Sequence, residues 1–168
     1  KVVAEAPSSM KEAYLAAEAL TDSKAKTEEF TFSGVIVGKR TNKNEKGEVE
    51  FFVQDGSYAI DLFNPTNKDS LAVGNRVTVT STLCNYNGTI ETTSDLKSVV
   101  VEGNADLPEA TFIDSAATLS STKVSVLANT EGVIKTIPAY SATADAKVVV
   151  TVGSDDINVF FKKNFIAA

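Results

Sequence analysis

The amino-acid composition of this chain excludes several kinds of catalytic and metal-binding site before any fold is considered. Its 168 residues include no histidine and a single cysteine, Cys84. Without histidine the chain cannot form a Ser–His or Cys–His nucleophile pair, use imidazole as an acid or base, or build the usual histidine-containing zinc site. Nothing beside Cys84 in the sequence suggests an activated thiol, so we predict a small buried core residue there.

Carboxylates are the remaining candidates for chemistry. Asp55 with Asp61, or Asp155 with Asp156, could bind calcium through oxygen, and a carboxylate pair could hydrolyse a glycoside without histidine. The sequence contains no EF-hand-type calcium loop, and Asp-Gly or Ser-Asp-Asp in a hairpin is ordinary turn chemistry. No spacing indicates that two carboxyls converge in a cleft. We therefore predict no catalytic residue, no metal site, no cofactor and no enzymatic activity.

One helix is predicted, at residues 9–20, and it precedes the predicted strands that could carry a binding site. Ser9 and Glu12 form an S-x-x-E capping box directly after Pro7 and Ser8. A stripe of larger apolar and small residues then follows at helical spacing: Met10, Ala13, Tyr14, Ala17 and Leu20.

From Phe30 onward the sequence changes to short alternating segments typical of strands. The candidate strands lie at residues 29–39, 48–56, 58–65, 71–83 and 89–101. Asn87-Gly88 is a strong hairpin signal between the last two. Short strands at such close spacing predict a small barrel or a sandwich.

The chain also matches itself along its length. Gly34-Val35-Ile36 matches Gly132-Val133-Ile134 at an offset of 98 residues, and the Gly56-Ser57 turn matches Gly153-Ser154 at an offset of 97. We interpret this as two copies of one module. The predicted division is a tail at 1–8, a first module with its helix at 9–103, a linker at 104–111 and a second, incomplete module at 112–168.

Three stretches together resemble a known family: GVIVGK from Gly34, FFVQDGSYAIDLFN from Phe51 and LAVGNRVTVTSTLCNYNGTIE from Leu71. They are similar to the OB-fold domains attached to secreted bacterial nucleases and surface lipoproteins. The resemblance covers about residues 9–103, and only the first three strands of 112–168. It implies an all-β fold with one N-terminal helix, built as tandem OB-fold-like small barrels of which the second is incomplete.

OB folds bind ligands across the face of their second and third strands. Alternation places Phe51, Val53, Ile60 and Leu62 inside, and it places Glu50, Phe52, Asp61 and Phe63 outside. The predicted ligand-binding residues are Phe52, Phe63 and Tyr58 as an aromatic platform, with Lys39, Arg40 and Lys43 of the adjacent loop as its basic rim. In the competing interpretation, Phe52 and Phe63 pack under the helix or against the second module and the loop is merely solvated.

The charge balance of the chain indicates which classes of ligand it can bind. The chain has 22 acidic and 16 basic residues, for a net charge of −6, and residues 30–103 contain nine acidic and seven basic residues. Glu50 and Asp61 on the proposed face would repel phosphates, so a carbohydrate or protein ligand is favoured over an oligonucleotide. No apolar run is long enough for a membrane helix.

We therefore predict a non-catalytic binding module, extracellular or at the cell surface. The location rests on the resemblance and on the Thr/Ser/Asn-rich stretch 78–94. Residues 1–7 do not read as a signal peptide, although they could be the mature end left after one was removed.

The alternative function is a structural subunit of an extracellular filament or surface assembly. The second module supplies strands only at 131–137, 147–152 and 157–165, and three strands cannot close a five-stranded barrel. The sheet would keep open edges. Five apolar residues would also remain partly exposed to solvent: Val148, Val150, Val152, Val159 and Phe161. A neighbouring molecule could add a strand there, with Val2-Val3-Ala4 as the best available donor. A fragment of a longer chain, or a variant fold, is an equal alternative.

Overall fold

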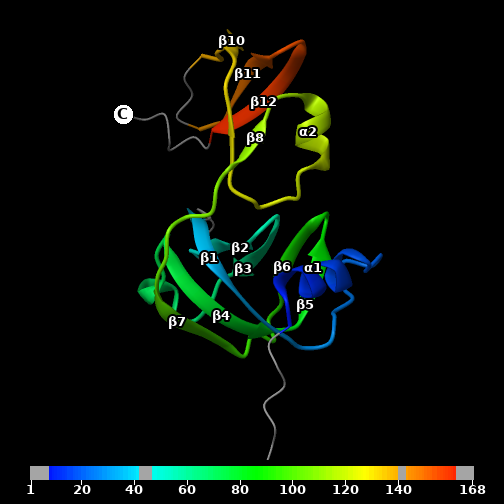
Figure 1. The fold of residues 1–168 in the computed structure, drawn as a ribbon, viewed down its shortest axis with the longest axis vertical. Helices are drawn as coiled ribbons and strands as arrows, with labels where there is room; N and C mark the ends of the chain where they lie inside the picture. The colour runs from blue at the N-terminus through cyan, green and yellow to red at the C-terminus, as the bar shows by residue number, and fades with distance from the viewer. Residues whose placement is uncertain (1–7, 42–46, 140–142, 162–168) are drawn as a thin grey trace, which may run out of the picture. The chain divides into compact units, whose positions relative to one another are not determined.

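The computed structural model describes residues 8–41, 47–139 and 143–161. Within these residues the chain is mostly β, with twelve strands, two α-helices and one 3₁₀ helix (Figure 1). Contacts divide it into two units: residues 1–110 with 123–127 form unit 1, and residues 111–122 with 128–168 form unit 2. The proposed donor Val2-Val3-Ala4 and the basic residue Lys43 lie outside the described residues.

Helix α1 (Met10–Glu18) opens unit 1 as the capping box predicts. The Ser9 hydroxyl accepts a hydrogen bond from the Glu12 amide at 3.2 Å, and the Glu12 carboxylate accepts one from the Ser9 amide at 2.9 Å. The predicted stripe is buried from Met10 through Ala17. Leu20 lies beyond the end of the helix, which stops at Glu18. The helix packs on strands of the same unit, mainly β3 (Tyr58–Phe63) and β5 (Leu83–Tyr86).

Seven strands form the sheet of unit 1. They are β1 (Phe30–Thr41), β2 (Val49–Asp55), β3 (Tyr58–Phe63), β4 (Asn75–Ser81), β5 (Leu83–Tyr86), β6 (Thr89–Thr92) and β7 (Ser98–Asn104), with the 3₁₀ helix η1 (Lys68–Ser70) between β3 and β4. Their order is β5-β6-β3-β2-β1-β4-β7. All pairs are antiparallel except β3 with β6, where Asp61 pairs with Glu91. Because only Thr82 separates β4 from β5, the hydrogen-bonded strands form a ring.

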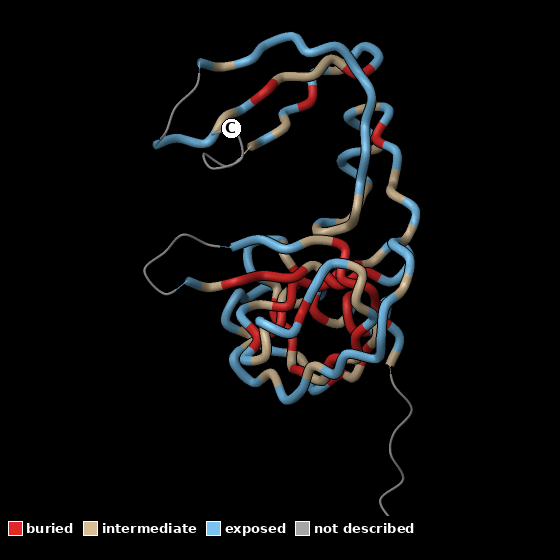
Figure 2. The backbone as a smooth tube through the Cα atoms, turned by 90° about the vertical axis from the view of Figure 1, so that its left-hand side faces the viewer, coloured by how far each residue is buried: buried red, intermediate tan, exposed pale blue. Residues whose placement is uncertain are grey.

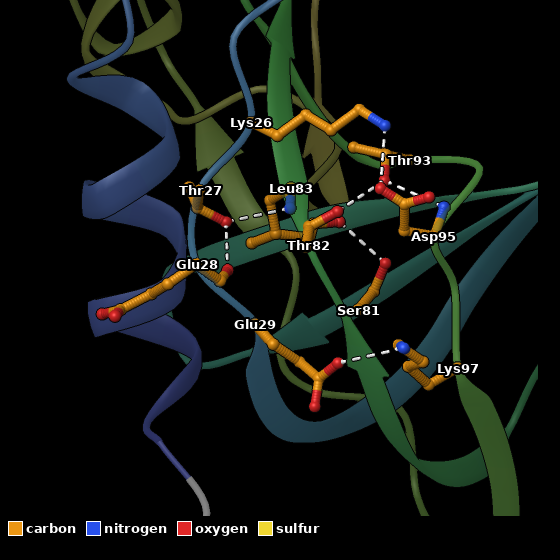
Figure 3. Close-up of polar contacts among 10 residues, drawn as sticks. All are labelled: Lys26, Thr27, Glu28, Glu29, Ser81, Thr82, Leu83, Thr93, Asp95 and Lys97. Carbon is orange, nitrogen blue, oxygen red and sulfur yellow. Dashed lines mark hydrogen bonds and ion pairs between the residues drawn. The ribbon is translucent and has the colours of Figure 1, made fainter.

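The bend at Thr82 is held by the connector that follows α1 (Figure 3). Thr27 donates its amide to the Leu83 carbonyl at 2.9 Å, and its hydroxyl accepts from the Leu83 amide at 2.9 Å. The Thr82 and Thr93 hydroxyls are 2.6 Å apart. The ammonium of Lys26 forms an ion pair with Asp95 at 2.8 Å. These contacts satisfy polar groups where the regular ladder is interrupted.

The core of unit 1 lies between α1 and the inner face of this sheet, and Figure 2 shows that most of the buried segments belong to this unit. Its largest buried side chains include Phe32, Phe51, Ile36 and Leu62. The β5–β6 turn uses Asn87 at φ 52° and Gly88 at φ 90°, the left-handed backbone that its Asn-Gly sequence predicts. A bulge in β1 falls between Ile36 and Gly38.

Unit 2 has a smaller set of elements. Strand β8 (Thr111–Ile113) pairs in parallel with β9 (Ala128–Thr130), and β10 (Val133–Thr136), β11 (Ala146–Val152) and β12 (Asp155–Phe161) form an antiparallel sheet in that order. Its buried apolar cluster contains Ile113, Val152 and Ile157. Of the residues expected to be partly wet, Val148 and Val152 are buried, whereas Val150, Val159 and Phe161 are half-buried.

The structure contains a second helix, α2 (Ala116–Ser121), which the sequence does not predict. Its segment, AATLSS, is short and has no apolar stripe, so its periodicity carries no signal. Two contacts hold its first turn. Ser115 caps the Thr118 amide at 3.1 Å, and the Asp155 carboxylate accepts from the Ala116 amide at 2.8 Å. The second contact comes from β12 and is therefore tertiary.

Candidate functional site

The outer face of β2 and β3, opposite the core, carries the candidate site. Val49, Phe51, Val53, Ile60 and Leu62 all belong to the core cluster, so the alternation of the two strands points inward as predicted. The outward positions are not exposed, however. Glu50 is 4% exposed and Asp61 is 1% exposed, so the expectation of exposed carboxylates is wrong. Alternation predicts which face a side chain occupies and not what covers that face.

Neighbouring strands place other side chains beside these two carboxyls. Asp61 on β3 pairs with Glu91 on β6, and Glu91 in turn pairs with Cys84 on β5. Glu50 on β2 pairs with Arg40 on β1. Carboxyl groups from three adjacent strands thus converge on one face of the sheet.

These groups border an open depression of about 530 Å³. It is lined by Arg40, Glu48, Glu50, Asp61, Phe63, Tyr86, Asn87, Thr89 and Glu91. Tyr86 and Asn87 come from the β5–β6 hairpin, which the Asn87-Gly88 turn positions. Tyr86 is 55% exposed. Polar groups and an accessible aromatic ring therefore face the same space.

A second, smaller depression of about 270 Å³ adjoins the first. Phe63 lines both of them, and the second is otherwise lined by Asn64, Thr66, Thr93, Ser94 and Leu96. Phe63 thus lies between two hollows with hydroxyl and amide linings. This arrangement suits an extended ligand better than a compact one.

Arg40 is the basic residue of the main depression. Its guanidinium forms an ion pair with Glu50, and it lies 5.9 Å from the centroid of the Phe52 ring. The Arg40 side chain is half exposed, whereas that of Glu50 is almost fully covered. The ion pair therefore partly neutralises a buried carboxylate from the solvent side.

Burial and mutual repulsion keep a proton on this cluster. Burial, then the neighbouring Glu50 charge, raises the pKa of Asp61 to about 8. Burial also raises the pKa of Glu91, with the Glu50 charge adding to the effect. One Asp61 oxygen, Oδ1, is buried and has no hydrogen-bond partner among the described residues. Near neutral pH, Asp61 is therefore a protonated acid.

Cys84 borders the same cluster. It is buried, as predicted, but it lies outside the core cluster, with its sulfur 3.9 Å from Glu91 Oε1. Burial, followed by the nearby Glu91 charge, raises the pKa of its thiol. A raised thiol pKa opposes nucleophilic reactivity.

The structure brings some of the predicted ligand-binding residues together and separates others. Arg40 and Phe63 line the main depression, and Phe52 lies beside it under the Arg40 guanidinium. Tyr58 packs against Tyr14 of α1, with ring centroids 5.3 Å apart, and belongs to the other face. The Lys39 ammonium lies 5.3 Å from the centroid of the core residue Phe51.

Sequence reasoning missed Tyr86, Asn87, Thr89 and Glu91 as members of the site. The Tyr-Asn-Gly hairpin was visible and could have suggested the first two, because loops beside an OB-type face commonly contact ligands. Glu91 had no such signal. Its position depends on the parallel pairing of β6 with β3.

A short segment from later in the chain covers another part of unit 1. The Lys123 ammonium forms an ion pair with Glu18 at 2.6 Å and lies 5.4 Å from the centroid of the Tyr14 ring. The Leu127 amide donates to Gln54 Oε1 at 2.6 Å. Residues 123–127 therefore contact α1 through Lys123 and the Gln54 end of β2 through Leu127.

Three further findings bear on function. Within the described residues, no helix is both long and apolar enough to cross a membrane. No group of three or more cysteine, aspartate or glutamate side chains in that part of the chain is arranged to hold a metal ion. No protein-family model matches the chain, and no curated protein matches it.

Proposed function

We propose that this chain is a non-catalytic, extracellular or cell-surface binding module of OB-fold type, and that unit 1 binds a carbohydrate on the outer face of β2 and β3. The strand order supports the fold assignment. If β4 and β5 are one bent strand and β6 and β7 another, the ring becomes a five-stranded barrel with one parallel pair, which is the arrangement of an OB fold.

Strand register supports the proposal that unit 2 is a second, partial copy. Ile36 pairs with Val53, and Ile134 pairs with Val150, at offsets of 98 (36 to 134) and 97 (53 to 150) residues. A bulge follows the first residue of both pairs. The turn between β2 and β3 and the turn between β11 and β12 both use a glycine at positive φ, Gly56 at 57° and Gly153 at 59°.

The residues that line the main depression are the observation that best supports carbohydrate binding. Its carboxylates and the Asn87 amide can accept hydrogen bonds from hydroxyl groups, and Asn87 and Thr89 can also donate. Tyr86 offers an exposed ring against which the apolar face of a sugar can pack. A phosphate is disfavoured because four carboxyl groups border this space and Arg40, its basic residue, is engaged with Glu50.

The same geometry supports binding over catalysis. Glycoside hydrolysis needs two carboxyl groups on opposite sides of the scissile bond. Glu50 and Asp61 lie on the same face of adjacent strands, so this pair would stand on one side of a bound ligand and cannot straddle a scissile bond.

A glycan array followed by calorimetry on the strongest hit tests the proposed function. Tyr86→Ala should weaken binding by about tenfold or more, which corresponds to about 1.4 kcal/mol. Its free energy of unfolding should stay within about 0.5 kcal/mol of the wild type, because the ring is exposed. Phe160→Ala removes an exposed aromatic ring from unit 2 and is the matched control. Sugar binding that Tyr86→Ala leaves unchanged would contradict the proposed site.

A second candidate function, strand-mediated self-assembly, has its own supporting observation. Val133 is 74% exposed and Ile134 is 56% exposed, whereas Val35 and Ile36 at the matching positions of unit 1 are buried. In unit 1, the first half of β1, from Phe30 to Val35, pairs with β4. Among the described strands, the sheet order β10-β11-β12 leaves β10 at an edge. An exposed apolar edge strand is a template for pairing with another chain.

Sedimentation velocity over a range of protein concentrations tests this second candidate. Self-association should increase with concentration and should be abolished by Ile134→Lys, because a charged side chain on an edge strand opposes pairing. Lys147→Ala, an exposed position on the central strand β11, is the control. A chain that stays monomeric at every concentration would exclude assembly through this edge.

A further inference from the structure

Among the residues that the structure describes, the lining of the main depression contains more acidic than basic side chains. Glu48, Glu50, Asp61 and Glu91 border it, and Arg40 is the positively charged side chain among its lining residues. Even with a proton on Asp61 and the Arg40–Glu50 ion pair formed, Glu91 still contributes an acidic group to the described lining. Such a surface favours a ligand with a positive charge.

A second observation points to a hydrogen-bond donor at the same place. Asp61 is 1% exposed, lines the depression and has one carboxyl oxygen without a hydrogen-bond partner among the described residues. A buried acceptor that lacks a donor costs free energy. Glu91 stands opposite Asp61 on β6, and it accepts a weak hydrogen bond from the Cys84 thiol at 3.9 Å. A group with several N–H donors and no acceptor would satisfy both carboxyls.

A primary ammonium has these properties. It provides three N–H donors, it is small, and its charge compensates the carboxylates as they ionise. The exposed Tyr86 ring on the neighbouring hairpin adds an apolar and cation-attracting surface beside the carboxyls. A sugar with a free amine combines an apolar ring face with an ammonium on one small ligand.

We infer that the depression selects amino sugars with an unacetylated amine, and that Glu91 and Asp61 receive the ammonium while Tyr86 packs on the sugar ring. The inference rests on the proposed carbohydrate-binding function. It adds a preference for charge at one position of the ligand. Arg40 then serves as the resident cation of Glu50 and leaves Glu91 and Asp61 to the ligand.

Calorimetry with two matched oligosaccharides tests the inference. Chitosan tetrasaccharide carries free amines, and chitin tetrasaccharide is the same chain with every amine acetylated and uncharged. The wild-type protein should bind chitosan tetrasaccharide about tenfold more tightly at low salt, and the difference should shrink at high salt. Glu91→Gln keeps the shape of the side chain and should remove most of the preference. Asp69→Asn, an exposed carboxylate on η1, should leave it unchanged.

Each possible result of this calorimetry either supports or overturns the ammonium preference. Equal binding of the two ligands, or tighter binding of the chitin oligomer, overturns the ammonium preference and leaves the carbohydrate site standing. A chitosan preference that Glu91→Gln and Asp69→Asn weaken equally shows diffuse charge attraction and also overturns it. If neither ligand binds, the inference fails, and the glycan array with Tyr86→Ala reports separately on the proposed function. Thermal unfolding of Glu91→Gln verifies that a loss of binding is not a loss of fold.

Discussion

Asp61 and Glu50 are diagonal neighbours on one face of the adjacent antiparallel strands β3 and β2, and both are nearly inaccessible to solvent. Two buried carboxyls this close to each other cannot both be ionised at little cost, so Asp61 retains a proton to higher pH than a free carboxylic acid would. The pair therefore links the stability of unit 1, the charge of the main depression and the pH of the solution.

Stability should fall as the pH rises from about 4 to about 8. The folded chain holds a proton on Asp61, whose pKa is about 8, across a range in which the unfolded chain has already released it from a group with an ordinary value of 3.8. The native state then binds more protons, so the free energy of unfolding decreases with pH by at most about 1.4 kcal/mol per unit from this group. Urea unfolding at several pH values measures this slope.

Asp61→Asn should flatten that slope, because asparagine keeps the shape of the side chain and does not titrate. At about pH 8 the variant should be as stable as the wild type or more stable. Asp69→Asn, at an exposed position, provides the comparison. A wild-type stability that rises steadily between about pH 5 and about pH 8 would show that Asp61 is ionised in the folded state.

Gly34→Ala and Gly132→Ala should each destabilise the unit that contains the glycine. A Cβ at Gly34 would lie 2.7 Å from the Gln54 carbonyl oxygen and 2.9 Å from Val53 Cγ1. A Cβ at Gly132 would collide with the Thr151 carbonyl and lie 2.9 Å from Val150 Cγ1. Overpacking of this kind costs about 1–3 kcal/mol, measurable by urea unfolding. Variants as stable as the wild type would mean that the two strands separate easily at these positions.

Ser9→Ala should lower the stability of unit 1 by about 1 kcal/mol, because it removes the hydroxyl that caps the Glu12 amide. Ser8→Ala changes the neighbouring serine, which is not the N-cap residue, and should have a smaller effect. Chemical denaturation of the two variants compares them directly. Equal losses would indicate that the cap contributes little once α1 is packed on the sheet.

Short single-stranded oligonucleotides should not form a tight complex with this chain at physiological ionic strength. Arg40 is engaged with Glu50, and the surrounding carboxyls repel phosphates. Fluorescence anisotropy with labelled oligonucleotides over a salt series measures this. The expectation fails if a submicromolar, salt-sensitive complex forms and disappears in the Lys39→Ala/Arg40→Ala variant.

Local features of this protein follow from sequence because neighbouring residues supply the forces. The Ser9–Glu12 capping box fixes the start of α1, and strand alternation places Phe51 and Leu62 in the core. The Asn87-Gly88 dipeptide determines the β5–β6 turn, because its left-handed backbone is costly for most other residues. Each of these depends on atoms a few positions apart.

The candidate site depended on tertiary structure. Glu91 meets Asp61 only because β6 pairs in parallel with β3, and no local pattern specifies that pairing. Helix α2 likewise depends on a carboxylate from β12. Sequence placed Glu50 and Asp61 on the outer face, but the folded sheet decided that they are covered, and burial is what raises the pKa of Asp61. The physical reason is that register and periodicity are local, whereas desolvation depends on every side chain that the completed sheet brings near.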